Sequence, residues 1–301
     1  MLEKSINLSN VIFELFGIKL TDDIAINGLN LCNRNTEKTS ILSYATKIDY
    51  LENVIKNTSI KALIVPDFEI SLYKEKLASK DIALVPHEFP EWAFYDVHDY
   101  LADKTDFYNI YDFSKVLGKN CSIHPSAIIE DGVTIGNNVT IGANTIIGSG
   151  SVLCDGVKIG KNSTIASEGF QIIRKNFVNR QVRHFGGLYI DSDTCIGDNV
   201  CVCRSLFEGN TYVGKNVMID NLSYIAHNCH IDDNAVITAG VMLCGSSKVE
   251  RGAWIGVNSS VLNRVVVEEN AMVGIGSVVT RNIDKNTVAY GVPAKKRLKS
   301  N

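Results

Sequence analysis

The feature that most constrains this chain is a period of six. Between residues 123 and 165, every sixth residue is a branched aliphatic, and the same spacing recurs over 190–202 and 213–279. An α-helix repeats every 3.6 residues and a strand every two, so neither accounts for this period. It is typical of a solenoid, in which each structural repeat packs only against its neighbours.

Three faces of six residues make one triangular coil of eighteen, so that residue n stacks on residue n+18 about 4.8 Å away. We call the aliphatic residue of each repeat the anchor and expect it to point into the prism. Small residues two positions before the anchor, such as Cys121 and Ala127, are expected at the tight corners. Glycine directly after the anchor, as in Ile135-Gly136, is expected to relieve the bend.

One segment interrupts the repeat. Residues 166–188, ASEGFQIIRKNFVNRQVRHFGGL, carry charges, aromatic rings and two adjacent glycines. They do not fit a coil of the prism and are predicted to form an extruded loop. Long loops in compact domains are usually functional. We therefore expect residues 119–301 to form an all-β parallel β-helix with this loop on it.

Residues 1–118 lack the repeat and are predicted to form a separate, small α/β domain. Apolar residues at helical spacing end at Gly17, and a second helix is expected over residues 47–59. The segment IKALIVPDF is typical of a buried strand that ends at Pro66. A further helix is expected from Pro90, a residue favoured in the first helical turn.

Composition excludes several classes of function. The net charge of -3 offers no electrostatic footprint for nucleic acid, and no apolar run approaches a membrane span. The N-terminus does not resemble a signal peptide. The eight cysteines show no zinc-site spacing, so we expect no metal. They are interpreted as free apolar fillers, which favours the cytoplasm.

Several segments together resemble a known family. They are ILSYATKIDYLENVIKNTSIKALIVPD, SEGF at 167–170, IDNLSYIAHN at 219–228 and LCGSSKV at 243–249. They are similar to the N-acyltransferases of the lipid A pathway, the LpxD type, whose hexapeptide repeats form a left-handed β-helix. The segment from Ser277, SVVTRNIDKNTVAYGVPAKKRL, instead looks like the end of acyl-CoA-dependent sugar acetyltransferases.

The resemblance implies a nucleotide site in the α/β domain. The family stacks the uracil of a UDP-sugar between two aromatic rings six residues apart, and Tyr44 and Tyr50 match these positions. Stacking on aromatic rings is worth about 1–3 kcal/mol per base. The family usually has asparagine where this chain has Thr46, so the base is either uracil or thymine. From the residues alone, the two tyrosines are typical of a half-buried core.

In the β-helix, His227 lies two residues after the anchor Ile225 and is therefore expected to face outward. Gly245 lies eighteen residues further on, one coil above it. Amide formation from a thioester needs a proton acceptor and a donor to the oxyanion, and an imidazole and a backbone N–H supply them. The resemblance implies that His227 is the general base and that Gly245 holds the oxyanion. Asp220 or Asn221, matching the family's DN, is expected to orient the imidazole or contact the sugar.

Further residues complete the predicted site. The acyl-CoA co-substrate is expected to contact Gly240, Gly245, Ser246 and Asn263, with its phosphates near Lys295 and Lys296. His184, on the extruded loop, is a second candidate for contacting substrate, on a neighbouring subunit. The family implies a homotrimer with sites between subunits. No tightly bound cofactor is expected.

The sequence therefore predicts an N-acyltransferase that moves an acyl group from acyl-CoA to a nucleotide-linked amino sugar for cell-surface glycan synthesis. Thr46 and Arg264, which replaces a histidine usual in the LpxD type, favour a dTDP-amino-deoxysugar. Two alternatives stay open. One is the lipid A reaction itself, on a UDP-3-O-acylglucosamine with acyl carrier protein as donor. The other is a β-helical binding scaffold without catalysis.

Overall fold

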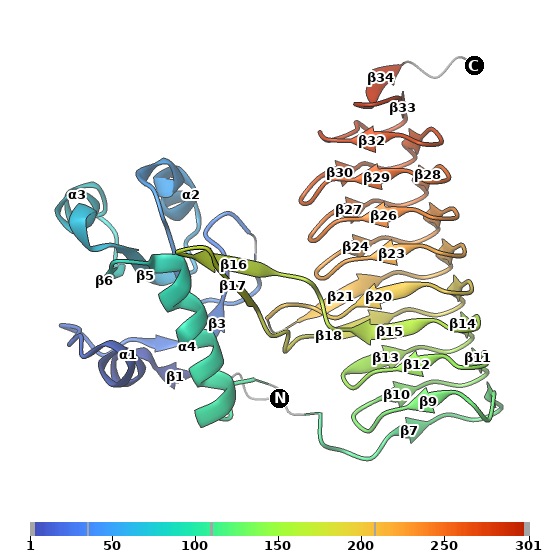
Figure 1. Cartoon of the computed structure of the whole chain (residues 1–301), viewed down its shortest axis with the longest axis horizontal. Helices are drawn as coiled ribbons and strands as arrows, with labels where there is room; N and C mark the ends of the chain where they lie inside the picture. The colour runs from blue at the N-terminus through green and yellow to red at the C-terminus, as the bar shows by residue number, and fades with distance from the viewer. Residues whose placement is uncertain (1–3, 35, 109–110, 208, 298–301) are drawn as a thin grey trace. The chain divides into compact units, whose positions relative to one another are not determined.

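The computed structural model describes residues 4–34, 36–108, 111–207 and 209–297 (Figure 1). The chain divides into an α/β unit, Met1–Asn109 with Gln171–Arg183, and a β-helix unit, Ile110–Phe170 with His184–Asn301. The boundary was predicted at residue 118, with the whole extruded loop in the second domain. Instead, the middle of that loop belongs to the α/β unit, so the chain passes between the units three times.

The β-helix unit is built from three parallel sheets, which we call faces 1, 2 and 3. Face 1 contains β7 (Val116–Leu117), β10 (Thr134–Ile135), β13 (Ser151–Leu153), β18 (Gly187–Ile190), β21 (Asn210–Val213), β24 (His230–Ile231), β27 (Lys248–Val249) and β30 (Val266–Val267). Face 2 contains β8 (Ser122–Ile123), β11 (Thr140–Ile141), β14 (Lys158–Ile159), β19 (Cys195–Ile196), β22 (Met218–Ile219), β25 (Val236–Ile237), β28 (Trp254–Ile255), β31 (Met272–Val273), β33 (Val288–Tyr290) and, antiparallel at its end, β34 (Lys295–Arg297). Face 3 contains β9 (Ile128–Ile129), β12 (Ile146–Ile147), β15 (Thr164–Ser167), β20 (Cys201–Cys203), β23 (Tyr224–Ile225), β26 (Met242–Leu243), β29 (Ser260–Val261) and β32 (Val278–Val279).

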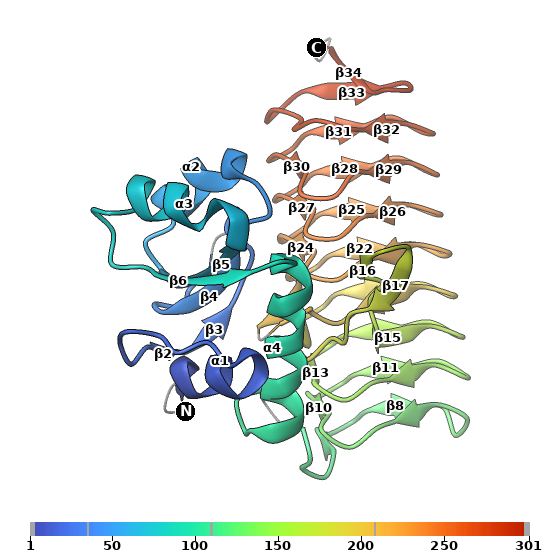
Figure 2. The ribbon, with the colours of Figure 1, turned by 60° about the vertical axis from the view of Figure 1, so that its left-hand side comes forward.

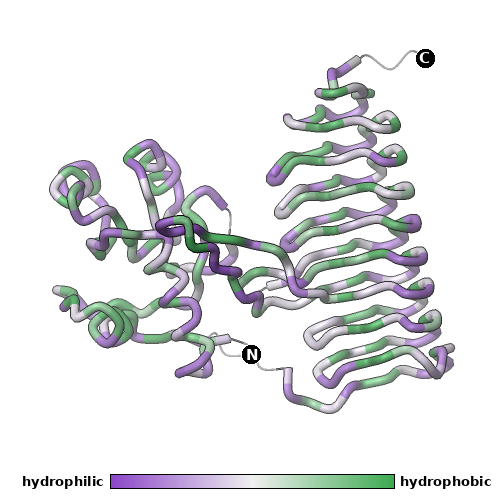
Figure 3. The backbone as a smooth tube through the Cα atoms, viewed as in Figure 1, coloured by the Kyte–Doolittle hydropathy of each residue, from purple (hydrophilic) through white to green (hydrophobic). Residues whose placement is uncertain are grey.

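The register follows the predicted eighteen-residue coil. Ile225 pairs with Leu243, and Leu243 pairs with Val261, each eighteen residues on. Figure 2 shows these coils stacked along the prism, and Figure 3 shows apolar segments recurring along each coil. Every anchor from Ile135 to Val279 is at most 2% exposed. Burying such a side chain contributes about 1.5–3 kcal/mol, so the column of anchors is the main source of stability in this unit.

The glycines after the anchors have a different role from the predicted one. The left-handed residue of a corner lies three positions after the anchor and is usually asparagine or glycine, as at Asn138 (φ 57) and Gly150 (φ 81). Gly136, directly after an anchor, is not left-handed. A Cβ on it would lie 2.4 Å from a carboxylate oxygen of Asp155 in the next coil. These glycines therefore permit the close approach of coils, and the residue two positions later makes the bend.

The α/β unit has a four-stranded parallel sheet in the order β3-β4-β5-β6 and a separate pair of strands, β1 and β2. Its elements in chain order are β1 (Ile6–Asn7), α1 (Leu8–Phe16), β2 (Ala25–Ile26), β3 (Gly28–Leu29), β4 (Ile41–Tyr44), the 3₁₀ turn η1 (Ile48–Tyr50), α2 (Leu51–Lys56), β5 (Ile60–Pro66), the 3₁₀ turn η2 (Asp67–Glu69), α3 (Ile70–Lys76), β6 (Ala83–His87), α4 (Pro90–Lys104), β16 (Ile172–Lys175) and β17 (Val178–Gln181). Helix α4 packs on β4 and β5, and α3 packs on β5 and β6. The predicted ends at Gly17, Pro66 and Pro90 agree with the structure.

Part of the extruded loop is an antiparallel hairpin, β16 with β17, that packs against α4. Arg180 donates to the carboxylates of Asp96 at 2.6 Å and Asp99 at 2.7 Å. Arg183 donates to Asp103 at 2.8 Å. These partly buried, charge-assisted hydrogen bonds fix the hairpin on the α/β unit. The predicted fold class, a small α/β domain plus a parallel β-helix, is confirmed.

Candidate active site

His227 lies at the corner between β23 and β24. Its position two residues after the anchor Ile225 directs the ring out of the prism core, as predicted. The side chain is nevertheless buried, with the residue only 6% exposed. We call this corner, residues 226–228, 244–246 and 262–264 of three successive coils, the His227 corner.

The hydrogen bonds of Asn228 determine which ring nitrogen of His227 carries the proton. Asn228 Nδ2 donates to Ser205 Oγ at 2.5 Å, and Asn228 Oδ1 accepts from the Leu206 N–H at 3.1 Å. These two bonds identify the oxygen that lies 2.9 Å from His227 Nδ1. Because that oxygen can only accept, Nδ1 carries the hydrogen, and in the neutral ring Nε2 carries the lone pair.

Gly245 lies one coil above His227, and the Ser246 N–H donates to the His227 carbonyl at 3.0 Å. A Cβ placed on Gly245 would be 2.8 Å from His227 Nε2. Any other residue would therefore collide with the edge of the ring that carries the lone pair. At the equivalent position in other corners, Lys161 and Lys215, the backbone N–H donates to an aspartate carboxylate. For Gly245 the described residues supply no acceptor, which leaves this amide available to a ligand.

His184 joins His227 at this corner, and both belong to the β-helix unit. The centres of the two rings are 5.2 Å apart with an edge-to-face angle of 66°. His184 is 2% exposed, and its Nδ1 lies 3.2 Å from Glu168 Oε2. Gly169 is required here, because a Cβ on it would be 2.3 Å from His184 Nε2. The loop histidine thus meets the general-base candidate of its own chain. That it contacts substrate on a neighbouring subunit stays a prediction.

Comparison with known proteins agrees with this architecture. The family model described as "Bacterial transferase hexapeptide (six repeats)" matches residues 114–149, 139–168 and 210–245, and "Hexapeptide repeat of succinyl-transferase" matches 248–281. The Acyl-[acyl-carrier-protein]--UDP-N-acetylglucosamine O-acyltransferase of Sinorhizobium fredii is 30% identical over 186 residues, which cover 58% of this chain and 67% of the relative. The chain belongs to the hexapeptide-repeat acyltransferases.

Other relatives match part of this chain. The UDP-3-O-acylglucosamine N-acyltransferase of Wolinella succinogenes is 28% identical over 175 residues, 58% of this chain. The chain covers 49% of that relative, about half of its length. The predicted resemblance to the LpxD type is confirmed. The crystal structure of LpxA from Bacteroides fragilis matches with a TM-score of 0.53 at 21% identity, over 63% of this chain and 71% of that one, and shares the left-handed parallel β-helix.

Three predicted site residues lie at another corner of the prism, between faces 2 and 3. Asp220 Oδ1 accepts from the Asn221 N–H, and Asn221 Oδ1 accepts from the Asp198 N–H at 2.6 Å. A Cβ on Gly240 would be 2.3 Å from Asn258 Oδ1. These contacts hold successive coils together. The prediction that Asp220 or Asn221 orients the imidazole is therefore wrong: Asn228 does so.

Some of the remaining residues predicted to contact the acyl donor lie at the His227 corner, and others lie elsewhere in the β-helix unit. Ser246 and Asn263 belong to the His227 corner, and Ser246 Oγ is buried without a hydrogen-bond partner among the described residues. Lys295 and Lys296 lie on β34, at the end of face 2, where Lys296 Nζ donates to Asp284 at 2.7 Å. The structure therefore places two of the six predicted donor contacts beside Gly245 and leaves the two lysines and Gly240 elsewhere.

In the α/β unit, the three predicted nucleotide-site residues differ in exposure. Tyr44 ends β4, its ring centre lies 5.0 Å from that of Phe94, and its hydroxyl donates to Glu91 at 2.8 Å. Burial, followed by the neighbouring Tyr95 and Glu91, raises the pKa of Tyr44 well above its ordinary value. Tyr50 is 38% exposed and Thr46 is exposed. Tyr44 is thus half-buried and held by Phe94 and Glu91, while Tyr50 and Thr46 are exposed.

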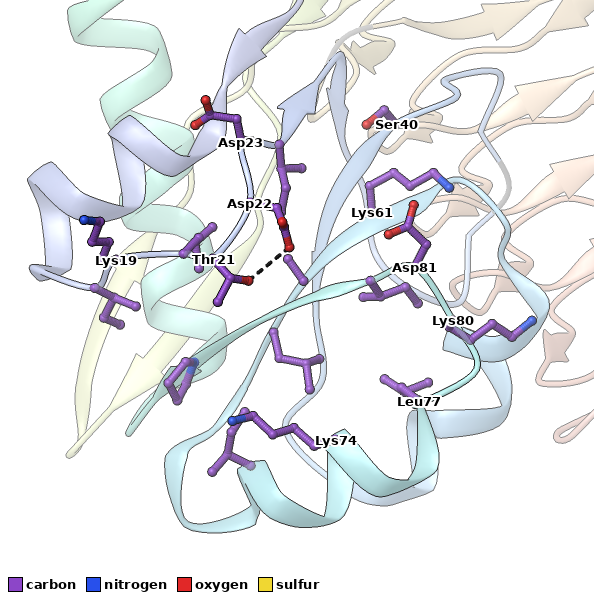
Figure 4. A pocket seen from close by; sticks show the side chains of 18 of the residues that line it. Lys19, Thr21, Asp22, Asp23, Ser40, Lys61, Lys74, Leu77, Lys80 and Asp81 are labelled. Carbon is purple, nitrogen blue, oxygen red and sulfur yellow. Dashed lines mark hydrogen bonds between the residues drawn. The ribbon is translucent and has the colours of Figure 1, made fainter.

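The α/β unit also holds a cleft of 740 Å³ that the sequence did not predict (Figure 4). It lies near the amino ends of the sheet strands and is lined by Ser40, Lys61 and Asp81. Tyr44 lies at the carboxyl end of β4, opposite to the amino ends of the strands, and does not line the cleft. Four lysines and three aspartates are interspersed along the cleft, so it has no dominant charge.

Neither a membrane-spanning helix nor a metal site is found among the described residues. No helix within the described ranges is long and apolar enough to span a membrane. No group of three or more potential ligands among these residues has the geometry of a metal site.

Proposed function

We propose that this chain transfers an acyl group from a thioester to the amino group of a nucleotide-linked amino sugar, with His227 as general base. The observation that carries the proposal is the fixed tautomer of His227. Asn228 holds the proton on Nδ1, which leaves the lone pair of Nε2 facing the gap left by Gly245. A base with this orientation accepts the proton of an attacking nucleophile.

The mechanism follows from these atoms. The neutral amine attacks the thioester carbonyl, and His227 Nε2 takes the proton that the nitrogen loses. The developing oxyanion accepts a hydrogen bond from the Gly245 N–H, which is worth roughly 10²- to 10³-fold in rate. The intermediate collapses, the carbon–sulfur bond breaks, and His227 returns its proton to the departing thiolate. No acyl-enzyme is needed. The pKa of Cys244 is raised by burial, which disfavours its thiolate as a nucleophile.

For the substrates, we favour the lipid A type of reaction. Relatives of this chain are named UDP-3-O-acylglucosamine N-acyltransferase, and another is named for an acyl carrier protein donor. These names support a UDP-linked acylated glucosamine as acceptor and acyl carrier protein as donor. They fit the chain better than the dTDP-amino-deoxysugar and acyl-CoA predicted from Thr46 and Arg264, which we retain as the second candidate.

A homotrimer forms part of the proposal and is supported by an apolar ladder on face 2. Met218, Val236, Trp254 and Met272 stack in register on successive coils. Met218, Trp254 and Met272 are 42%, 43% and 39% exposed. A contiguous apolar strip of this kind typically marks an interface. Light scattering of the wild type should give three chains per particle. Trp254→Glu should lower that number, and a monomeric wild type would contradict the assembly.

The experiment that tests the function combines two acceptors with two donors. UDP-3-O-acylglucosamine and a dTDP-amino-deoxysugar are each incubated with acyl carrier protein thioester and with acyl-CoA, and amide formation is followed by mass spectrometry. We expect turnover with the UDP-sugar and carrier protein. Turnover only with the dTDP-sugar and acyl-CoA would establish the second candidate. If the protein binds a nucleotide sugar but transfers no acyl group in any combination, it is a binding scaffold.

A further inference from the structure

Both ends of the extruded loop belong to the β-helix unit and meet beside His227. Glu168 follows β15 directly, where the loop begins, and His184 lies shortly before β18, where the loop returns. The proposed mechanism gives neither side chain a step. Their contacts nevertheless lead from the protein surface to the ring of the general-base candidate.

One short piece of backbone after β20 holds both ends of the loop. The Arg204 N–H donates to the Ser167 carbonyl at 2.9 Å, and Arg204 Nε donates to the Gly186 carbonyl at 2.7 Å. The Gly186 N–H donates to the Ser205 carbonyl at 3.0 Å, and Ser205 Oγ accepts from Asn228 Nδ2. The two ends of the loop and the residue that fixes the His227 tautomer are therefore held together.

The His184 ring is anchored by Glu168. Its Nδ1 lies 3.2 Å from Glu168 Oε2. An ionised carboxylate can only accept, so this contact favours the proton of His184 on Nδ1. The His184 side chain is fully buried, whereas the Glu168 side chain is 55% exposed. A carboxylate at the surface thus orients a buried ring.

The hydrogen bond from Asn228 does not by itself fix the orientation of the His227 ring. A bond to Nδ1 lies in the ring plane and determines the tautomer, but the ring can still tilt about that bond. The His184 ring packs on it at an edge-to-face angle of 66°, with the ring centres 5.2 Å apart. This arrangement is one that aromatic pairs prefer at separations of about 4.5–7 Å. Gly245 lies against the edge that carries Nε2, so the two contacts together restrict the tilt.

We propose that Glu168 and His184 are positioning residues for His227. Glu168 holds the His184 ring, and that ring restricts the tilt of His227, so that Nε2 stays directed to the gap beside Gly245. In this role neither side chain contacts substrate or takes up a proton. The role rests on the proposed function, in which His227 Nε2 is the base.

The structural test measures nuclear Overhauser effects between the ring protons of His184 and His227 in the full-length chain. We expect strong effects in the wild type and a loss of at least about half of their intensity in Glu168→Ala, because His184 loses its anchor. Glu168→Gln should retain the wild-type intensities, since its amide oxygen accepts at the same position. Because Glu168 is exposed, Glu168→Ala should unfold within about 2 °C of the wild type. Equal intensities in the wild type and Glu168→Ala would overturn the proposal.

Asp232→Ala is the matched control. Asp232 Oδ1 lies 2.7 Å from His230 Nε2 outside the His227 corner, so this variant also removes a carboxylate from a histidine of the β-helix unit. The effects between His184 and His227 should keep their intensity in it. An equal loss in Asp232→Ala and Glu168→Ala would show a general loosening of the unit, which would contradict a specific role for Glu168.

The kinetic test separates positioning from substrate binding. Glu168→Ala should lower kcat about tenfold and leave the Michaelis constants within about twofold, because the base is present but less often aligned. Glu168→Gln and Asp232→Ala should both stay within about twofold of the wild-type kcat. A raised Michaelis constant with unchanged kcat would make Glu168 a substrate contact. A Gln variant as impaired as the Ala variant would show that the charge is required, and either result would overturn the positioning role.

The two tests fail in different ways. The Overhauser measurement needs no acyl transfer, so a wild type without turnover would refute the proposed function and leave the geometric test in force. Unchanged effects in Glu168→Ala would refute the positioning role even in an active enzyme.

Discussion

The two units of this chain differ in whether a residue has structural equivalents within its own unit. In the β-helix unit, one six-residue pattern is used again and again, so each position has equivalents in other coils for comparison. In the α/β unit, no position is repeated, and Tyr44 or Lys61 has no internal equivalent. A departure from the pattern is visible in the first unit, and there it marks the site: a histidine at a corner, a glycine above it, and a loop that breaks the period.

The two units also differ in how packing stabilises them. Each coil of the β-helix contacts only the coils above and below, so its stability is approximately a sum of neighbouring terms. The sheet of the α/β unit is covered by helices that pack on several strands at once, as α4 does on β4 and β5. We therefore expect mutations to act locally in the β-helix and across the whole unit in the α/β part.

The largest expected effect comes from removing the feature that departs most from the repeat. His227→Ala should lower kcat by roughly 10²- to 10⁴-fold, because the general base is lost. His230→Ala is the control: His230 is exposed, stacks on Tyr212 and lies outside the His227 corner. Because His227 is buried, its mutant should also lose about 1 kcal/mol of unfolding free energy. Wild-type turnover in His227→Ala would show that the corner is only structural.

The second prediction separates two uses of glycine in the repeat. Gly245→Ala should reduce turnover about 100-fold, since its Cβ would be 2.8 Å from His227 Nε2 and would displace the ring. Gly276→Ala is the matched control, because it has φ 62 and a Cβ added there would meet nothing within 4 Å. It should cost about 1 kcal/mol of stability and leave turnover unchanged. Equal kinetics in the two variants would remove Gly245 from the site.

The third prediction compares two asparagines at the same position of different corners. Asn228 and Asn234 are both left-handed, with φ 58 and 59. Both alanine variants should lose about 1 kcal/mol of stability from backbone strain. Only Asn228→Ala should also lower kcat, about tenfold, because the Nδ1 proton of His227 loses its acceptor. The pH–rate profile and the ¹⁵N signals of His227 should change in that variant alone.

The fourth prediction tests the contrast in stability directly. Ile237→Ala in the β-helix and Leu63→Ala in the α/β sheet each delete a fully buried side chain and should each cost about 2–5 kcal/mol. Hydrogen exchange should show lost protection around β25 and its neighbours β22 and β28 in the first variant. In the second, exchange should rise throughout the α/β unit. A global increase for Ile237→Ala would show that the coils unfold together.

The smallest effect on stability is expected at Tyr50, one of the nucleotide-site candidates. Tyr50→Ala removes a partly exposed ring and should change unfolding free energy by less than about 0.5 kcal/mol. If Tyr50 stacks on the base, the Michaelis constant for the nucleotide sugar should rise about tenfold or more. Tyr44→Ala should raise it too, but at a clear cost in stability, since Tyr44 packs on Phe94 and binds Glu91. An unchanged Michaelis constant in both variants would place the base elsewhere.

Much of the β-helix could be predicted because its information is local and repeated. The anchors, the eighteen-residue register and an interruption of the repeat all follow from spacing and are present in the structure. The interruption is shorter than the predicted 166–188, because Ala166 and Ser167 belong to β15 and Gly187 and Leu188 to β18. The role of the glycines could not be predicted, because Gly136 depends on Asp155 in the next coil. Asn228 was missed as the partner of His227, although it is the next residue in the chain.

The sequence by itself determined that this chain winds into a prism with an α/β domain before it, and that His227 and Gly245 share a corner. It did so because stacking at a fixed step turns distance along the chain into distance in space. Only the tertiary structure decided that His184 packs against His227 and that His227 is buried. These contacts join segments with no common period, and the positions of their side chains depend on packing that spacing does not encode.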